Sequence, residues 1–175
     1  MVSKMSQTQV QRLLIKDRTS LCFETFRLNT RLGVSAATET HIDANWERDD
    51  TTGTTLGDQI TESSGIFSFP TTGIYKVDFQ PYFFDSSGDS RYCAAYIYTT
   101  PDNSTYTQRA EALSFIQITS SSYTYAVPRA TLVFDVTNTT THKVQFRVLN
   151  ESALDLEAQT SRNATFVTFH RLGDT

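Results

Sequence analysis

The sequence predicts an all-β protein, built as a sandwich or barrel of nine or ten short strands. Three observations carry this prediction. The chain of 175 residues holds 28 Thr, 17 Ser, 12 Phe and 8 Tyr, and threonine and aromatic residues are enriched in strands. Apolar and polar residues alternate with a period of two in short runs separated by turn residues. The length suits one domain that can fold without metals or disulfides.

The first 18 residues differ from the rest and are predicted to form an N-terminal arm. Val10, Leu13 and Leu14 fall at positions i, i+3 and i+4, as on one face of an amphipathic helix. So short a helix is marginal alone in water, so we expect these three residues to anchor the arm on a partner. The alternative is a frayed terminus with no role. Residues 19–175 are then the β domain.

The strands follow in order from residue 20. The His41–Arg48 run alternates cleanly, with Ile42, Ala44 and Trp46 on one face. The His142–Leu149 run does the same, since Val144, Phe146 and Val148 alternate with charged or amide side chains. The full set of expected strands is Leu21–Asn29, His41–Arg48, Gly65–Phe69, Ile74–Phe79, Arg91–Thr100, Tyr106–Ile118, Tyr123–Val136, His142–Leu149 and Ala164–Leu172.

Charge and hydropathy exclude two classes of partner. The net charge of −4 and the sequence pI near 5.3 argue against sequence-independent binding to nucleic acid. No segment approaches the ~20 consecutive apolar residues of a membrane helix. The first residues also lack the apolar core of a secretory signal, so we expect synthesis in a cytoplasm.

Catalytic, metal and cofactor motifs are missing from the sequence. There is no Gly-x-Ser-x-Gly elbow and no HExxH, GxGxxG or Walker motif, so His41, His142 and His170 are expected to be non-catalytic. We expect no cofactor. Asp85 and Asp89 flank a Gly-containing turn and could bind calcium, but solvated turn carboxylates explain them equally well. Cys22 and Cys93 are expected to be buried free thiols, although one disulfide is arithmetically possible.

The most specific motif runs from Gly65 to Tyr75. Pro70 fixes the turn and Gly73 permits a backbone conformation that other residues avoid. Five residues match the signature Gly-x-Phe-x-x-Pro-x-x-Gly-x-Tyr: Gly65, Phe67, Pro70, Gly73 and Tyr75. In this motif and along residues 20–172 the chain resembles the complement globular-head domains of the tumour-necrosis-factor-like superfamily. Around the motif we expect a buried core of Phe67, Phe69, Tyr75, Val77, Phe79, Phe146 and Phe169.

The resemblance implies an antiparallel jelly-roll sandwich of about ten strands that forms a homotrimer, with the first and last strands near the threefold axis. The closing strand departs from the family at Thr168, where glycine is usual. Six tyrosines could form a carbohydrate or protein patch, but an aromatic trimer interface is the preferred interpretation. These are Tyr92, Tyr96, Tyr98, Tyr106, Tyr123 and Tyr125. The residues expected in the interface are Tyr92, Tyr96, Tyr98 and Phe166.

The absence of a collagen-like stalk and the short arm favour a viral protein over a plasma protein or a cytokine. We therefore expect a non-enzymatic virion protein, a trimeric capsid decoration or cement protein of a tailed phage. Its arm would bind the major capsid protein or another virion protein. The alternative is the trimeric head of a tail fibre that binds a host-surface glycan or protein, and a jelly-roll glycosidase ranks below both. The fold by itself does not fix the choice.

Overall fold

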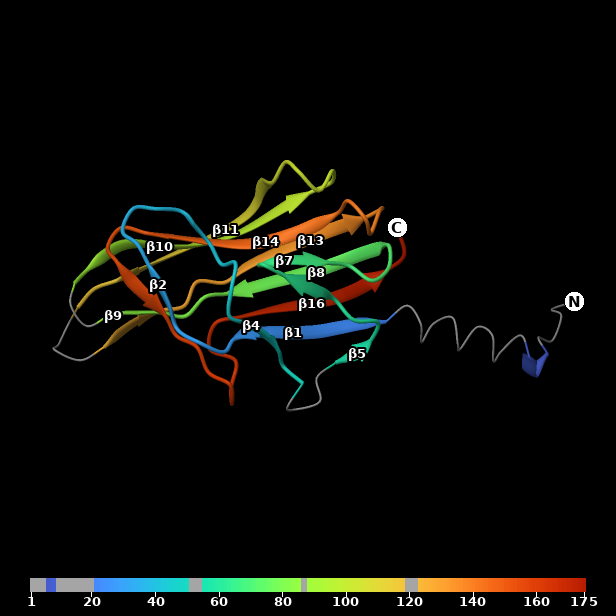
Figure 1. The fold of residues 1–175 in the computed structure, drawn as a ribbon, viewed down its shortest axis with the longest axis horizontal. Helices are drawn as coiled ribbons and strands as arrows, with labels where there is room; N and C mark the ends of the chain where they lie inside the picture. The colour runs from blue at the N-terminus through green and yellow to red at the C-terminus, as the bar shows by residue number, and fades with distance from the viewer. Residues whose placement is uncertain (1–5, 9–20, 51–54, 86–87, 119–122) are drawn as a thin grey trace, which may run out of the picture.

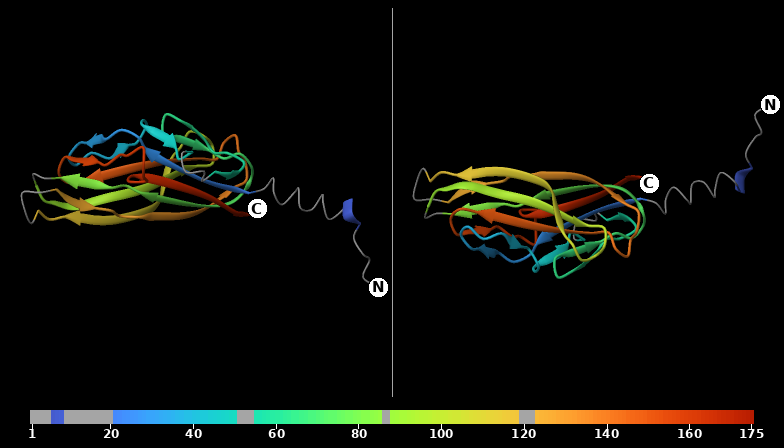
Figure 2. Two further views of the ribbon diagram at one scale, coloured as in Figure 1. Left: turned by 90° about the horizontal axis from the view of Figure 1, so that it is seen from below. Right: turned by 90° about the horizontal axis from the view of Figure 1, so that it is seen from above.

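The structure, a computed structural model, describes residues 6–8, 21–50, 55–85, 88–118 and 123–175. Every described strand pairing is antiparallel, and the strands make two packed layers elongated along the strand direction (Figures 1 and 2). The fold class is therefore the predicted one, an all-β jelly-roll sandwich. No helix among the described residues is long and apolar enough to cross a membrane.

The first sheet contains the first long strand and the last strand side by side. Its order is β13-β8-β16-β1-β4, and β5 pairs with the start of β1. The beginning of β1 and the end of β16 lie at the same end of the sandwich (Figure 1). The strands are β1 (Cys22–Leu28), β4 (Trp46–Arg48), β5 (Leu56–Gly57), β8 (Gly73–Gln80), β13 (Ala130–Val136) and β16 (Phe166–Gly173).

The second sheet has the order β11-β10-β14-β7-β6, and β3 also pairs with β14. A smaller four-stranded sheet, β12-β9-β15-β2, forms the end of the sandwich opposite the start of β1 (Figure 1). The second sheet consists of β3 (Thr40–His41), β6 (Thr61–Ser63), β7 (Ile66–Ser68), β10 (Ser90–Thr100), β11 (Thr107–Ile116) and β14 (Lys143–Asn150). The small sheet consists of β2 (Leu32–Val34), β9 (Phe83–Asp85), β12 (Thr124–Ala126) and β15 (Leu154–Leu156).

The core lies between the sheets and is rich in aromatic rings. Phe67 is fully buried, and its ring centroid lies within 5.5 Å of the rings of Phe26, Trp46, Phe146 and Phe169. The predicted core is confirmed, since each of its members is at most 4% exposed. Its residues are Phe67, Phe69, Tyr75, Val77, Phe79, Phe146 and Phe169.

The Gly65–Tyr75 motif crosses from one sheet to the other, because β7 belongs to the second sheet and β8 to the first. Gly65 has φ = 74°, and a Cβ there would lie 2.2 Å from the carbonyl oxygen of Ile42. Gly73 has φ = 147°, and its Cβ would lie 2.6 Å from a backbone oxygen of Gly173. The Tyr75 hydroxyl donates to the Thr71 carbonyl oxygen at 2.9 Å and closes the turn. Both glycines are thus required by close backbone contacts.

Two predicted strands are wrong as single elements. Tyr123–Val136 divides into β12 and β13, which belong to different sheets, because residues 127–129 between them pair with no described strand. His41–Arg48 divides into β3 and β4. β3 ends at His41 and β4 begins at Trp46, and Asn45 between them has φ = 67°. Ile42 and Trp46 are both buried, as predicted, but Ala44 is exposed. The Trp46 Nε1 donates to the Ile42 carbonyl oxygen at 2.9 Å, so a short loop places both side chains in the core.

The cysteines are free and buried, as predicted. Burial raises the pKa of the Cys22 thiol to about 12 and raises that of Cys93 as well. At the turn considered for calcium, the Asp85 Oδ2 accepts from the Gly88 amide at 3.1 Å and the Asp89 Oδ1 accepts from the Ile118 amide at 2.5 Å. Within the described part of the chain no group of three or more His, Cys, Asp or Glu residues could hold a metal ion.

Candidate trimer interface

The four residues predicted for the trimer interface lie on two different faces. Tyr92, Tyr96 and Tyr98 belong to β10, in the second sheet, and alternate with the buried Cys93, Ala95 and Ile97. The three tyrosines therefore point outward from the second sheet. Phe166 begins β16 in the first sheet, where the buried Val167 and Phe169 point inward. Because the sandwich separates these two outer faces, they cannot form one continuous patch.

The second-sheet tyrosines belong to a network within the chain. The Arg147 guanidinium lies 4.2 Å from the centroid of the Tyr98 ring, and its Nη1 donates to Glu39 at 2.8 Å. The Tyr98 hydroxyl donates to the other Glu39 oxygen at 3.1 Å. Burial and the Glu39 carboxylate raise the pKa of Tyr98. One face of the Tyr98 ring is thus already covered, and Tyr96 is only 7% exposed.

The outer face of the first sheet is built of cross-strand rows that run over four strands. One row places Phe23, His170, Lys76 and Val133 side by side on β1, β16, β8 and β13. This row mixes the apolar Phe23 and Val133 with the basic His170 and Lys76. The next row is polar and consists of Thr25, Thr168, Asp78 and Thr131.

The same outer face continues without a break onto the small sheet. Buried or partly buried residues alternate with exposed ones through the whole of 123–136, so Tyr123, Tyr125 and Val127 point the same way as Val133. In the neighbouring β8–β9 segment Tyr82 and Phe84 continue the outward positions of β8. The Tyr82 ring packs tilted against Tyr125 at 5.3 Å between centroids, and Phe84 meets Tyr123 edge to face at 5.4 Å.

Exposed apolar side chains gather along this outer face. Tyr123, Tyr125 and Val133 are 54%, 51% and 59% exposed, although each is large and apolar. Exposed apolar side chains that form a patch mark a surface that associates. We call this outer face of the first and small sheets the aromatic face. Its exposed members are Tyr123, Tyr125, Val127, Val133 and Leu172.

The sandwich is open on one side, between β11 and β13. Each of these strands is the edge strand of its sheet, and the two lie next to each other. In the described residues they are not paired by backbone hydrogen bonds. Their inward side chains pack on the core but stay partly accessible. This open seam consists of Ala110, Ala112, Leu132 and Phe134. It adds a second apolar surface beside the aromatic face, since β13 carries residues of both.

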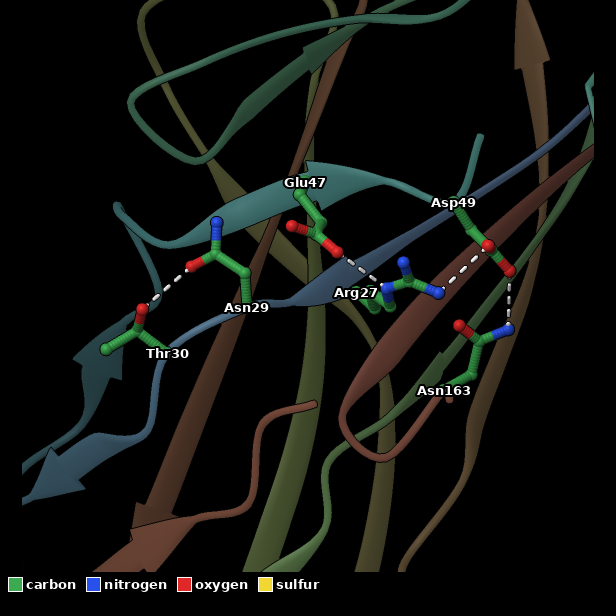
Figure 3. A network of polar contacts seen from close by, with 6 residues as sticks. All are labelled: Arg27, Asn29, Thr30, Glu47, Asp49 and Asn163. Atoms are coloured by element: carbon green, nitrogen blue, oxygen red, sulfur yellow. Dashed lines mark hydrogen bonds and ion pairs between the residues drawn. The ribbon is translucent and has the colours of Figure 1, made fainter. Parts of the chain in front are cut away.

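A buried ionic network holds the edge of the aromatic face at Phe166. Arg27, which is opposite Phe166 in register, is 2% exposed and donates through Nε to Glu47 at 2.8 Å. Its Nη1 donates to Asp49 at 2.9 Å, and the Asn163 amide donates to the second Asp49 oxygen at 3.1 Å (Figure 3). The network thereby ties β1 and β4 to the segment that enters β16.

Several solved structures superpose on this arrangement of strands. The tumour necrosis factor Eiger from S. frugiperda superposes with a TM-score of 0.65 at 16% identity, over 89% of this chain and 95% of that one. Two structures of murine APRIL, at pH 5.0 and pH 8.0, each give a TM-score of 0.60 at 14% identity, over 87% of this chain and 99% of theirs. The fold is the tumour-necrosis-factor jelly roll. No protein-family model and no curated protein sequence matches the chain.

Some residues of the aromatic face were predicted from the sequence. Tyr123 and Tyr125 are among the six tyrosines considered for an interface, and Phe166 lies on the face too. Tyr82, Phe84 and Val133 were not selected from the sequence. The signal for them is the alternation that continues through Pro81 and Pro128, both of which are buried inward positions. The predicted arm anchor of Val10, Leu13 and Leu14 lies outside the described residues.

Proposed function

We propose that the chain is a non-enzymatic structural protein that forms a homotrimer and decorates or cements a virion capsid through its N-terminal arm. The observation that carries the trimer is the aromatic face, whose exposed tyrosine and aliphatic side chains need a partner surface. The resemblance seen in the Gly65–Tyr75 motif and the jelly-roll fold both support it.

The geometry favours a ring of three copies. The aromatic face and the open seam are different surfaces, so the seam of one copy can pack on the face of the next. Such a head-to-tail contact produces a closed ring of three when each copy is rotated by one third of a turn from the previous copy. A threefold ring places β1 and β16 of each copy toward its centre, as the family resemblance implies.

The positions of β1 and β16 support the proposed attachment through the arm. The start of β1 and the end of β16 lie at the same end of the sandwich (Figure 1). An arm that precedes β1 would therefore leave every copy of a trimer at one end. In the proposed virion this end faces the capsid protein, and the small sheet at the opposite end faces outward.

Replacing Tyr125 by arginine tests the interface. Tyr125 is 51% exposed, so the isolated fold should tolerate the change, whereas three buried guanidinium groups in the ring should prevent assembly. We expect the wild type to sediment as a trimer and Tyr125→Arg as a folded monomer. The matched control is Tyr92→Arg on the outer face of the second sheet, which should stay trimeric. A monomeric Tyr92→Arg beside a trimeric Tyr125→Arg would return the interface to the tyrosines of β10.

Deleting residues 1–18 tests the arm. The deletion removes no described strand, since β1 begins at Cys22, so the shortened chain should fold and form trimers. Particles assembled with it should lack the protein, because the anchor of Val10, Leu13 and Leu14 is gone. Electron microscopy of the particles and a gel of their protein content measure this. Normal occupancy by the shortened chain would show that the β domain itself makes the attachment.

A further inference from the structure

His170 lies in the middle of the proposed interface. It belongs to β16, its side chain is exposed in the single chain, and its cross-strand neighbours are Phe23 on β1 and Lys76 on β8. The imidazole meets the Phe23 ring edge-on, with centroids 5.7 Å apart and planes at 78°. In the proposed trimer a second copy would cover this row and remove its water.

The charged groups around His170 supply no carboxylate directly opposite it. On β8 the Lys76 ammonium is 2.9 Å from Asp78. Asp78 also accepts from Thr131 at 2.6 Å and faces Arg129 at 3.6 Å. Burial alone would raise the pKa of Asp78, but its bonds from Thr131 and Lys76 hold that pKa below the ordinary value. The Asp78 carboxylate therefore already forms ion pairs with two cations, Lys76 and Arg129.

Strands β13, β1 and β5 carry the other residues that lie near His170. On β13 the exposed Asp135 lies opposite Ile74, one row from His170. On β1 the outward neighbours Phe23 and Thr25 are uncharged, and Asp58 follows β5 at the edge of the sheet. Lys76 and Arg129 are balanced by Asp78 and Asp135, so these four groups carry no net charge.

We propose that His170 makes the trimer acid-sensitive: protonation of its imidazole places a second cation beside Lys76 in the covered interface and loosens the assembly. This rests on the proposed trimer. Histidine side chains gain a proton between about pH 7.5 and 5.5. Like charges opposite each other on neighbouring strands destabilise a sheet, and covering a cation without a carboxylate partner is costly. The edge-on contact with the Phe23 ring acts in the opposite direction through cation–π attraction.

The sign of the effect follows from proton binding. The trimer disfavours protonated His170, so it binds fewer protons at this site than the separated chains do. Falling pH therefore favours separation. The repulsion between His170 and Lys76 is also present in the separated chains, where water screens it, so only its increase on covering and the lost hydration of the cation weaken the trimer. With three such sites, the dissociation constant should rise roughly 3- to 100-fold from pH 7.5 to 5.5.

Subunit exchange measures this for the full-length protein. Trimers labelled with a donor or an acceptor dye are mixed at pH 7.5 and at pH 5.5, and energy transfer reports how fast the copies mix. We expect faster exchange for the wild type at pH 5.5. His170→Gln should exchange slowly at both pH values, and His170→Lys should exchange quickly at both. The control His41→Gln, on β3 in the second sheet and away from the aromatic face, should keep the wild-type pH response.

Each outcome separates this inference from the proposed trimer. A wild type that sediments as a monomer at pH 7.5 overturns the trimer and the inference with it. A trimer whose exchange rate is the same at both pH values overturns the inference alone. So does a His170→Gln variant that keeps the full response, or a His170→Lys variant that exchanges as slowly as the wild type at pH 7.5. Melting curves of all variants show whether each one is folded.

Discussion

Replacing Phe67 by alanine is expected to lower the free energy of unfolding by about 3–5 kcal/mol. Phe67 is fully buried and packs against the rings of four aromatic residues from both sheets. Truncation removes the transfer free energy of the ring and leaves a cavity that the surrounding rings cannot fill without moving. Urea unfolding at one fixed protein concentration measures the change, because association would add stability of its own.

Two other phenylalanine variants provide comparisons for the stability loss of Phe67→Ala. Phe79→Ala, at another fully buried position, should also cost about 3–5 kcal/mol. Phe115→Ala should change the unfolding free energy by no more than about 0.5 kcal/mol, since Phe115 is 63% exposed on β11. Equal losses at Phe67 and Phe115 would contradict the assignment of inward and outward faces.

Replacing Arg27 by methionine is the second large change, with an expected loss of about 3–5 kcal/mol. The guanidinium is 2% exposed and holds Asp49, whose side chain is 4% exposed, at 2.9 Å. Methionine keeps much of the volume but removes the cation, so the buried Asp49 carboxylate loses that ion pair. Removing one partner of a buried pair costs more than the pair itself contributes.

A surface pair provides the matched control. Arg91 is 81% exposed and bonds Glu151 at 2.5 Å, so Arg91→Met should cost at most about 1 kcal/mol. Adding Asp49→Asn to Arg27→Met should restore part of the lost stability, because the buried carboxylate that faced Arg27 is then replaced by a neutral amide, while the other partner, Glu47, is 28% exposed to water. If Arg27→Met unfolds at the wild-type urea concentration, the network of Figure 3 does not stabilise the fold.

Long strands such as β8, β13 and β14 could be predicted from the sequence because each alternates over six or more residues. The two- and three-residue strands β2, β5, β6, β9 and β15 could not, since so few residues contain no periodic signal. His41–Arg48 misled the prediction for a related reason. Ile42 and Trp46 are both buried, and alternation alone does not distinguish a continuous strand from a loop that Asn45 bends with φ = 67°.

The interface shows a different limit of sequence reasoning. Alternation establishes that Tyr96 and Tyr98 point away from Ile97, and the structure agrees. Alternation does not say to which sheet a strand belongs, because strand order depends on long-range pairing. β10 pairs with β11 and β14, whereas β12 pairs with β9 and β13 with β8. The tyrosines of β10 and those beside β12 therefore reach opposite outer faces.

The two buried thiols have a practical consequence for labelling. They are the chain's only cysteines, both are enclosed by the sandwich, and burial raises the pKa of each. Maleimides and similar reagents attack the thiolate form of accessible cysteine, so the native protein offers them almost nothing to attack. A single cysteine introduced on the surface would become the one reactive handle, with no need to mutate Cys22 or Cys93. The folded chain can therefore carry a dye, a spin label or a gold cluster at a chosen position.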